Sequence, residues 1–234
     1  MNNPCDNEIK FILDSSTPTI SLTPYSLTNS EITSSNVPNN TDLIPGKYEG
    51  GLKIWECSLD LLNFITEKYN AISLSSFNVL ELGCGHGFPG IYFALKQSAL
   101  TVFQDFNKEV LDKATKQYFS QLKEKYNVDL ISKCLFVDGD WGSFTSNVCF
   151  DVILSADTLY NIDNYEKIYN IIKKYLNKGG IAYFATKKFY FGVGGGALSF
   201  YSYVKNQNEF EVCIEKEINN GISNIRNILS IKWK

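Results

Sequence analysis

The fold of this chain is decided by the stretch Val79-Leu80-Glu81-Leu82-Gly83-Cys84-Gly85-His86-Gly87-Phe88-Pro89-Gly90. An apolar run, a glycine-dense turn and a proline close to the next apolar run are typical of a β-strand that leads directly into an α-helix. Glycine lets the backbone adopt positive φ and approach a ligand closely. The amides of such a turn and of the following helix N-terminus favour negative charge. The stretch therefore predicts a site for a nucleotide-like cofactor that carries an anionic group.

Apolar runs alternate with amphipathic helical patterns on both sides of this stretch. The expected strands are 79–82, 100–104, 133–137, 152–155, 181–186, 210–214 and 228–232, and the expected helices are 54–69, 89–96, 108–126, 164–176 and 197–206. Such alternation is typical of an α/β fold, here a seven-stranded, mostly parallel sheet with helices on both faces. The last two strands have no helix between them, so we expect an antiparallel pair at one edge. The pair Gly179-Gly180 is expected to stop the fourth helix.

The 234 residues suffice for one α/β domain with a sizeable core, and 44% of them are hydrophobic. Residues 1–41 are rich in Ser, Thr, Asn and Pro, and we expect a flexible or loosely docked N-terminal arm ahead of a domain over 42–234. The net charge is −3, and Arg226 is the only arginine. Since the basic residues form no clustered stripe, direct binding of nucleic acid is not expected.

Six widely spaced cysteines and a single histidine, His86, argue against a structural metal site, and we expect none. Scattered cysteines in a chain of this size fit reduced thiols in the cytoplasm or nucleus, which is the expected location. No apolar run approaches 18 residues, so a membrane span is not expected, and neither is a signal peptide. We expect His86 to fill space in the glycine loop.

Two cofactors compete for the glycine loop. The run from Gly85 to Gly90 matches the dinucleotide pattern G-x-G-x-x-G, and Asp105 at the end of the second strand could accept hydrogen bonds from ribose hydroxyls in either case. The run also contains Glu81-x-Gly83-x-Gly85, which is the pattern of seven-strand methyltransferases. After the third strand, residues 139–141 supply an acid and an aromatic face for an adenine ring. These features favour S-adenosyl-L-methionine over a nicotinamide dinucleotide.

The sequence resembles the eukaryotic protein-histidine methyltransferases, within the seven-strand protein methyltransferase group. The resemblance spans about residues 42 to 200. It is carried by Tyr48-Glu49-Gly50-Gly51-Leu52-Lys53-Ile54-Trp55-Glu56-Cys57-Ser58, the glycine loop, Phe103-Gln104-Asp105-Phe106-Asn107, Gly139-Asp140-Trp141, Asp157-Thr158-Leu159-Tyr160-Asn161 and Tyr190-Phe191-Gly192-Val193-Gly194-Gly195-Gly196. It implies a Rossmann-like class I methyltransferase fold.

The resemblance also implies the residues that contact the cofactor. Trp55 would cover the ligand, Asp105 would lie at the ribose and Trp141 at the adenine. The full set is Ile54, Trp55, Glu56, Cys57, Ser58, Gly83, Gly85, Gln104, Asp105, Phe106, Gly139, Asp140, Trp141 and Ser155.

The implied substrate is a histidine of a large-subunit ribosomal protein, methylated at the ring Nε2 atom. Neutral imidazole is a lone-pair nucleophile near pH 7, and an acceptor for its Nδ1–H would select the reactive tautomer. We assign this polar wall to Asp157, Tyr160 and Asn161, which follow the fourth strand. The alternative is that Asp157 caps the following helix and Tyr160 only packs.

Three other functions also fit parts of the sequence. A protein-lysine methyltransferase of the same group and a non-catalytic cofactor-binding adaptor both fit the pattern, and a nicotinamide-dependent reductase fits the glycine loop alone. The expected partner is a protein substrate, with no membrane contact and a monomeric chain. The glycine-rich run 192–196 is expected either to shape the substrate channel as a flexible loop or to be a plain turn, and residues 187–190 are expected to rim the entrance.

Overall fold

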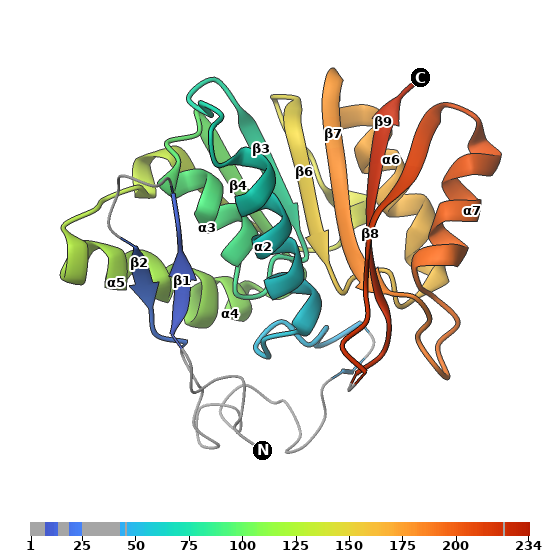
Figure 1. The fold of residues 1–234 in the computed structure, drawn as a ribbon, viewed down its shortest axis with the longest axis horizontal. Coiled ribbons are helices and arrows are strands. Elements are labelled where there is room, and N and C mark those ends of the chain that lie inside the picture. The colour runs from blue at the N-terminus through green and yellow to red at the C-terminus, as the bar shows by residue number, and fades with distance from the viewer. Residues whose placement is uncertain (1–7, 14–18, 25–42, 45, 222) are drawn as a thin grey trace.

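The computed structural model describes residues 8–13, 19–24, 43–44, 46–221 and 223–234. They form a seven-stranded sheet in the order β5-β4-β3-β6-β7-β9-β8 (Figure 1). The strands are β3 (Asn78–Leu82), β4 (Leu100–Asp105), β5 (Cys134–Asp138), β6 (Phe150–Ala156), β7 (Leu176–Lys187), β8 (Phe210–Ile218) and β9 (Arg226–Trp233). Strands β3 to β7 pair in parallel, whereas β9 pairs antiparallel with both β7 and β8. The predicted fold class and its antiparallel edge pair are confirmed.

The strand order reverses between β3 and β6, because β4 and β5 continue to one side of β3 while β6 and β7 continue to the other. In open α/β sheets, ligands bind outside the carboxyl ends of the strands at such a switch point. The carboxyl ends of the parallel strands lie at the lower edge of the sheet in Figure 1, beside the segment that precedes α2.

Helices cover both faces of the sheet. They are α2 (Glu56–Tyr69), α3 (Phe88–Leu95), α4 (Lys108–Val110), α5 (Lys116–Tyr126), α6 (Tyr165–Tyr175) and α7 (Ala197–Gln207). A π-helical turn, Leu111–Thr115, joins α4 and α5 into the single helical run that the sequence predicts. The boundaries of the other predicted elements hold to within a few residues, apart from the start of β7 and the end of β8.

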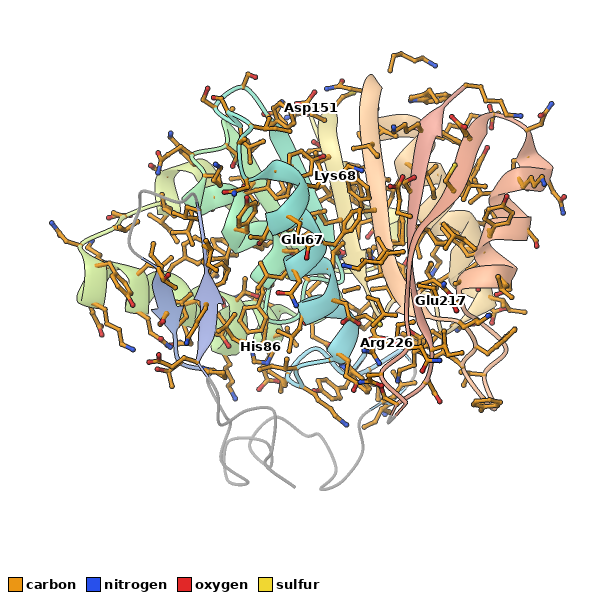
Figure 2. All side chains as sticks on the ribbon, viewed as in Figure 1. Glu67, Lys68, His86, Asp151, Glu217 and Arg226 are labelled. Carbon is orange, nitrogen blue, oxygen red and sulfur yellow. The ribbon has the colours of Figure 1, made fainter. Side chains whose placement is uncertain are left out.

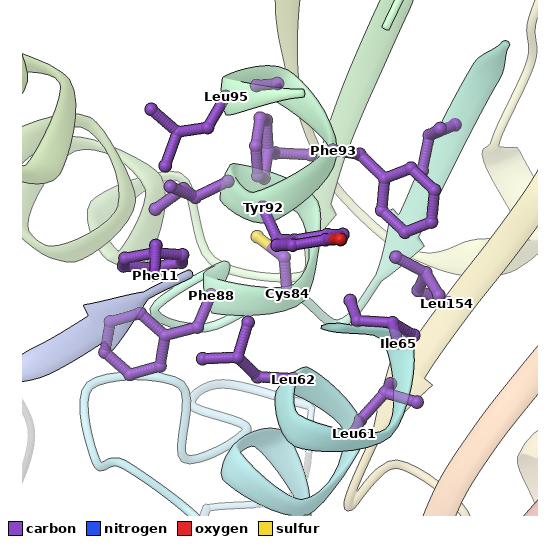
Figure 3. Packing of buried hydrophobic residues seen from close by; sticks show 14 of the residues in the cluster. Phe11, Leu61, Leu62, Ile65, Cys84, Phe88, Tyr92, Phe93, Leu95 and Leu154 are labelled. Atoms are coloured by element: carbon purple, nitrogen blue, oxygen red, sulfur yellow. The ribbon is translucent and has the colours of Figure 1, made fainter. Parts of the chain in front are cut away.

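Two hydrophobic clusters form the core, one on each face of the sheet. Helices α2, α3 and α5 pack on the first face, which lies toward the viewer in Figure 1, and α6 and α7 pack on the second. Successive residues of a strand point to opposite faces, so Val79 joins the first cluster and Leu80 the second. Figure 3 shows how Leu62 and Ile65 of α2 meet Phe88 and Tyr92 of α3 in the first cluster. Burial on both faces explains why the strands read as continuous apolar runs.

The described part of residues 1–41 is docked onto this core. A two-stranded hairpin, β1 (Ile9–Phe11) and β2 (Ile20–Leu22), buries Phe11 and Leu22 completely in the first cluster. Its backbone also pairs with α5, since the Tyr126 hydroxyl both accepts from the Ser21 N–H and donates to the Ser21 carbonyl, each at 2.9 Å. The predicted loosely docked arm is therefore held tightly where it is described, and residues 1–7, 14–18 and 25–42 lie outside the described residues.

The prediction that Gly179-Gly180 ends a helix is wrong. Helix α6 ends at Tyr175, and β7 begins at the next residue and includes both glycines. Leu176 already has extended dihedral angles, φ −77° and ψ 124°, and is paired with Phe150 of β6. Pairing to β6 therefore ends the helix earlier than the local glycine signal suggests.

In the part of the chain that the structure describes, no helix combines the length and the apolar character needed to cross a membrane.

Candidate functional site

A cavity of about 390 Å³ opens at the carboxyl ends of the parallel strands. The loops after β3, β4, β5 and β6 line it from one side, and the segment that precedes α2 lines it from the other. The predicted site residues that line it are Ile54, Trp55, Ser58, Gly83, Gly85, Asp105, Phe106, Gly139, Asp140, Trp141, Asp157, Tyr160 and Asn161. A cavity of this size at a topological switch point is suited to a nucleoside-sized ligand.

Four predicted cofactor residues do not line the cavity. The Glu56 carboxylate lies 3.4 Å from the Arg226 guanidinium on β9, outside the site. The Cys57 and Ser155 side chains are buried beside the cavity. Gln104 is buried and contacts two residues that do line the cavity. Its Oε1 atom accepts from Trp141 Nε1 at 2.7 Å, and its Nε2 atom donates to the Gly139 carbonyl at 2.7 Å. Gln104 therefore holds in place the loop expected to meet adenine.

The glycine loop lies against the segment that precedes α2. Gly85 has φ 53°, and a Cβ atom there would lie 3.1 Å from the Gly51 carbonyl oxygen. Glycine at this position therefore satisfies both the left-handed backbone and the close approach of the two loops. The Glu81 carboxylate is buried in β3 and accepts from the Gly90 N–H in the first turn of α3 at 2.7 Å. Burial is the main reason why the pKa of Glu81 rises to about 8.

Asp105 closes β4 and faces the cavity. Its Oδ2 atom accepts from the Gly85 N–H at 2.9 Å, and its Oδ1 atom accepts from the Asn107 N–H at 3.0 Å. Burial raises the pKa of Asp105 to about 6; the charge of Glu49 adds to the rise, while the backbone donors oppose it. Each carboxylate oxygen has a second lone pair, so both can still accept from ligand hydroxyls.

Asp140, in the loop after the neighbouring strand β5, has both carboxylate oxygens engaged. Lys167 donates to its Oδ2 atom at 2.7 Å, and the Gly142 N–H donates to its Oδ1 atom at 2.7 Å. The hydrogen bond from Lys167 is the main reason why the pKa of Asp140 lies below its usual value. The half-buried Trp141 ring lies beside it on the cavity wall.

His86 anchors the segment that precedes α2. Its Nε2 atom lies 3.0 Å from the Leu52 carbonyl oxygen, and its Nδ1 atom lies 2.7 Å from the Tyr118 hydroxyl. A carbonyl only accepts, so Nε2 carries the proton and Nδ1 accepts from Tyr118. Burial lowers the pKa of His86 to about 4, which keeps the ring neutral. His86 (Figure 2) was predicted only to fill space in the glycine loop. Its two hydrogen bonds also link that loop to α5 and to residue 52.

Asp157 is committed to two neighbours. Its Oδ2 atom accepts from the Cys57 N–H in the first turn of α2 at 3.2 Å, and its Oδ1 atom accepts from the Tyr190 hydroxyl. Asp157 therefore caps α2, which precedes it in the chain, and not the following helix that the alternative interpretation named. Burial raises the pKa of Asp157, and the hydrogen bonds from Tyr190 and Cys57 oppose that rise.

Glu49, from the segment that precedes α2, is a further carboxylate that lines the cavity. The Tyr160 hydroxyl donates to its Oε2 atom, and the Gly46 N–H donates to its Oε1 atom at 2.9 Å. Glu49 and Tyr160 are both half-buried cavity residues. Burial, together with Glu49, raises the pKa of Tyr160, so the phenol keeps its proton. Glu49 was not among the site residues predicted from the sequence, where its only signal is its place in the segment 48–58.

The glycine-rich run 192–196 packs against this polar wall. The Gly195 N–H donates to the Tyr160 carbonyl at 3.1 Å, and a Cβ atom on Gly195 would lie 2.2 Å from the Leu159 carbonyl oxygen. Val193 lines the cavity, and Phe191, which is 85% exposed, stands beside it in the loop. The run is therefore fastened to the site, and its role in shaping a substrate channel stays a prediction.

The described residues contain no group of three or more His, Cys, Asp or Glu side chains that could hold a metal ion. The cavity instead combines an acid at one strand end, two tryptophan rings and a wall of tyrosine, asparagine and carboxylate. Such a site can bind a nucleoside at one end and present hydrogen-bond acceptors to a second, polar reactant at the other.

Comparison with known families gives one match that covers most of the domain. The family model described as lysine methyltransferase matches residues 45–192. The chain is 43% identical over 199 residues to the Histidine protein methyltransferase 1 homolog of Dictyostelium discoideum, covering 84% of this chain and 62% of that relative. It is 35% identical over 218 residues to the homolog of Bos taurus, covering 82% of this chain and 58% of that relative. The chain thus spans about three fifths of the length of these curated relatives.

Comparison with solved structures identifies the same fold. The magnesium protoporphyrin IX methyltransferase of Synechocystis, solved with S-adenosylmethionine bound, superposes with a TM-score of 0.57 at 13% sequence identity. The superposition covers 75% of this chain and 80% of that chain. At this identity the likeness shows the fold alone.

Proposed function

The chain belongs to the lysine methyltransferase family, and from that premise we propose that it is an S-adenosyl-L-methionine-dependent protein methyltransferase. We further propose that its target is a histidine of a large-subunit ribosomal protein, methylated at Nε2. The observation that carries this proposal is the cavity itself, whose lining includes both Asp105, suited to a ribose, and an acceptor wall formed by Tyr160 and Asn161. The similarity to the named histidine protein methyltransferases supports the choice of histidine.

The cavity residues fit the proposed cofactor. Asp105 has lone pairs left for the ribose hydroxyls, and Trp141 offers an aromatic face to adenine. Trp55 lines the cavity, and its Nε1 atom donates to the Gly50 carbonyl at 2.9 Å. When bound, S-adenosyl-L-methionine supplies a methyl group on a positively charged sulfur, and the chain has to hold the acceptor nitrogen in line with it.

The acceptor wall suits a histidine substrate. A free imidazole has a pKa of about 6.5 and is mostly neutral at pH 7, so it needs no base to become a nucleophile. Its Nε2 atom carries the lone pair only when Nδ1 carries the proton. Tyr160 and Asn161 line the cavity and could accept that proton's hydrogen bond, although the Asn161 Oδ1 atom also accepts from the Asp163 N–H at 2.9 Å. We propose that Asp157 supports this wall from behind through Tyr190 and α2.

The second candidate is methylation of a lysine, which the description of the matching family model favours. A lysine ammonium must lose a proton before it can attack, because its pKa is about 10.4. A non-catalytic adaptor that binds the cofactor without transferring its methyl group is the third candidate.

We propose that the protein acts as a monomer in the cytoplasm and nucleus, without direct contact to nucleic acid or membrane.

Tritiated S-adenosyl-L-methionine tests these candidates. Extracts of D. discoideum cells that lack their own Histidine protein methyltransferase 1 homolog would be incubated with the protein, with and without prior removal of ribosomes. Amino-acid analysis of the labelled proteins separates Nε2-methylhistidine, Nδ1-methylhistidine and methyl-lysine. We expect Nε2-methylhistidine in a large-subunit protein. Label in methyl-lysine would favour the second candidate, and binding of the cofactor without any label would favour the adaptor.

A further inference from the structure

Two of the carboxylates that line the cavity, Asp157 and Glu49, contact tyrosine hydroxyls, and they serve different purposes. The carboxylate of Asp157 accepts from Cys57 and Tyr190, and neither of these partners lines the cavity. Glu49, by contrast, directs its Oε2 atom at the hydroxyl of Tyr160, and both residues line the cavity. The carboxylate that reaches the acceptor wall is therefore Glu49.

We propose that Glu49 is the positioning residue of the reaction: it fixes the hydroxyl proton of Tyr160, so that the phenol oxygen faces the substrate imidazole as an acceptor. This inference rests on the proposed histidine methylation and deepens it by naming the residue that selects the substrate tautomer. Asp157, one of the three residues predicted for the polar wall, then supports the site only through the backbone of α2 and through Tyr190.

The direction of the hydrogen bond carries the argument. An ionised carboxylate can only accept, and a phenol has one proton to donate. Once the proton of Tyr160 points to Glu49, only lone pairs of the phenol oxygen remain for other partners. An imidazole that presents Nδ1–H to this oxygen leaves its Nε2 lone pair free for the methyl group. The opposite tautomer presents a lone pair to a lone pair and is disfavoured.

Glu49 is held in place on several sides, as positioning requires. The Gly46 N–H donates to its Oε1 atom at 2.9 Å, and its own backbone N–H donates to Asn107 Oδ1 at 3.1 Å. Asn107 in turn donates through Nδ2 to the Lys47 carbonyl at 2.7 Å. Since Asn107 lies two residues after Asp105, the last residue of β4, the loop that carries Glu49 is fixed to the same strand end as Asp105.

The charge of Glu49 also acts during the reaction. The imidazole Nε2 forms a bond to the methyl carbon as the carbon–sulfur bond breaks, and the electron pair of that bond stays on sulfur. The ring thereby gains one positive charge, while the sulfur loses its own. Glu49 is then one hydroxyl group away from the new cation and strengthens the hydrogen bond from Nδ1–H to Tyr160. After release, the ring gives up its Nδ1 proton to water.

The substrate Nδ1–H, the Tyr160 hydroxyl and the Glu49 carboxylate form a hydrogen-bond relay, and a double-mutant cycle tests it. The variants are Glu49→Gln, which removes the charge, Tyr160→Phe, which removes the hydroxyl, and the two combined. The substrate is protein extracted from large ribosomal subunits of the D. discoideum cells described above. We expect each single variant to lower kcat about 10- to 100-fold, because one preorganised electrostatic contact is lost. The double variant should be at most about threefold slower than the slower single variant, since both changes break one relay.

Three further measurements separate positioning from a structural role. The dissociation constant of S-adenosyl-L-methionine by calorimetry, the KM for the protein substrate and the thermal midpoint should each stay close to the wild-type value in both single variants. Glu211→Gln on β8, an exposed carboxylate far along the sheet, is the matched control and should retain wild-type kcat.

The outcomes separate this inference from the proposed function. Losses that multiply in the double variant, wild-type kcat in Glu49→Gln, or a loss explained by weaker cofactor binding would each overturn the relay. If the wild-type protein forms methyl-lysine, the proposed function fails whatever the variants do. If it forms methylhistidine but the losses multiply, only the relay fails.

Discussion

The carboxylate of Asp157 accepts a hydrogen bond from the backbone N–H of Cys57, a residue 100 positions earlier in the chain. This single contact joins the end of β6 to the first turn of α2, and so to Trp55, which precedes α2 and lines the cavity. The loop after β6 and the segment before α2 are therefore one structural unit, although the sequence separates them.

Replacing Asp157 should weaken the fold as well as the site. In Asp157→Ala, the Cys57 N–H and the Tyr190 hydroxyl lose their acceptor, and each buried unsatisfied donor costs about 1–3 kcal/mol. We expect the free energy of unfolding to fall by about 2–4 kcal/mol in urea titrations, and the affinity for S-adenosyl-L-methionine to fall with it. Asp157→Asn, whose amide oxygen can still accept one bond, should lose less. A wild-type unfolding curve for Asp157→Ala would show that the capping contact contributes nothing.

Asp105 should control cofactor affinity. We expect Asp105→Asn to weaken S-adenosyl-L-methionine binding by about 10- to 100-fold in calorimetry, because hydrogen bonds to a charged acceptor contribute about 1.5–3 kcal/mol. The matched control is Asp138→Asn at the end of the neighbouring strand, since Asp138 pairs with Asp105 in the sheet register and does not line the cavity. Equal losses in both variants would contradict a specific role for Asp105.

Protonation of His86 should make the fold sensitive to acid. Its pKa is about 4 in the folded protein and about 6.5 in an unfolded chain, so the unfolded state binds the proton more strongly below pH 6.5. The contribution of His86 to stability is complete above pH 6.5 and declines as the pH falls toward 4. Between pH 7 and pH 5 we expect a loss of about 2 kcal/mol from this group.

His86→Gln isolates that loss from the titration of buried carboxylates. Urea titrations of the wild-type protein and the variant at pH 7 and pH 5 give four free energies of unfolding. The stability advantage of the wild type should shrink by about 2 kcal/mol at the lower pH, because glutamine does not titrate. A pH-independent difference would mean that His86 keeps an ordinary pKa in the folded protein.

Gly195 should be irreplaceable for geometric reasons. A Cβ atom there would lie 2.2 Å from the Leu159 carbonyl oxygen, so Gly195→Ala must push the run 192–196 away from Tyr160. We expect kcat to fall at least about tenfold, since small displacements of positioned groups cost that much or more. Gly179→Ala is the matched control, because a Cβ atom there meets nothing within 4 Å. Circular dichroism and methyl transfer, measured together, separate misfolding from a displaced loop.

The fold class was readable from the sequence because the signals that set it are local. The apolar run 79–82, the glycines after it and the alternation of helical and strand periods depend on residues a few positions apart. The same local signals place Asp105 and the segment 139–141 at neighbouring strand ends, which is where the structure has them. The start of β7 differs from the prediction because Leu176 already pairs with Phe150 of β6, whereas the continuous register of β7 with β6 begins at Ile181, after the two glycines.

The order of strands and helices along the chain, the class of the fold and the loops that border the cavity follow from the sequence alone. Hydrophobic periodicity and glycine turns depend only on residues a few positions apart. The tertiary structure alone decided that Asp157 caps α2, that Glu49 meets Tyr160 across 111 positions, and that Phe11 and Leu22 bury the described arm in the core. These contacts join segments far apart in the chain. They form only after the sheet has brought the strand ends together, and no local pattern in the sequence encodes such a distance.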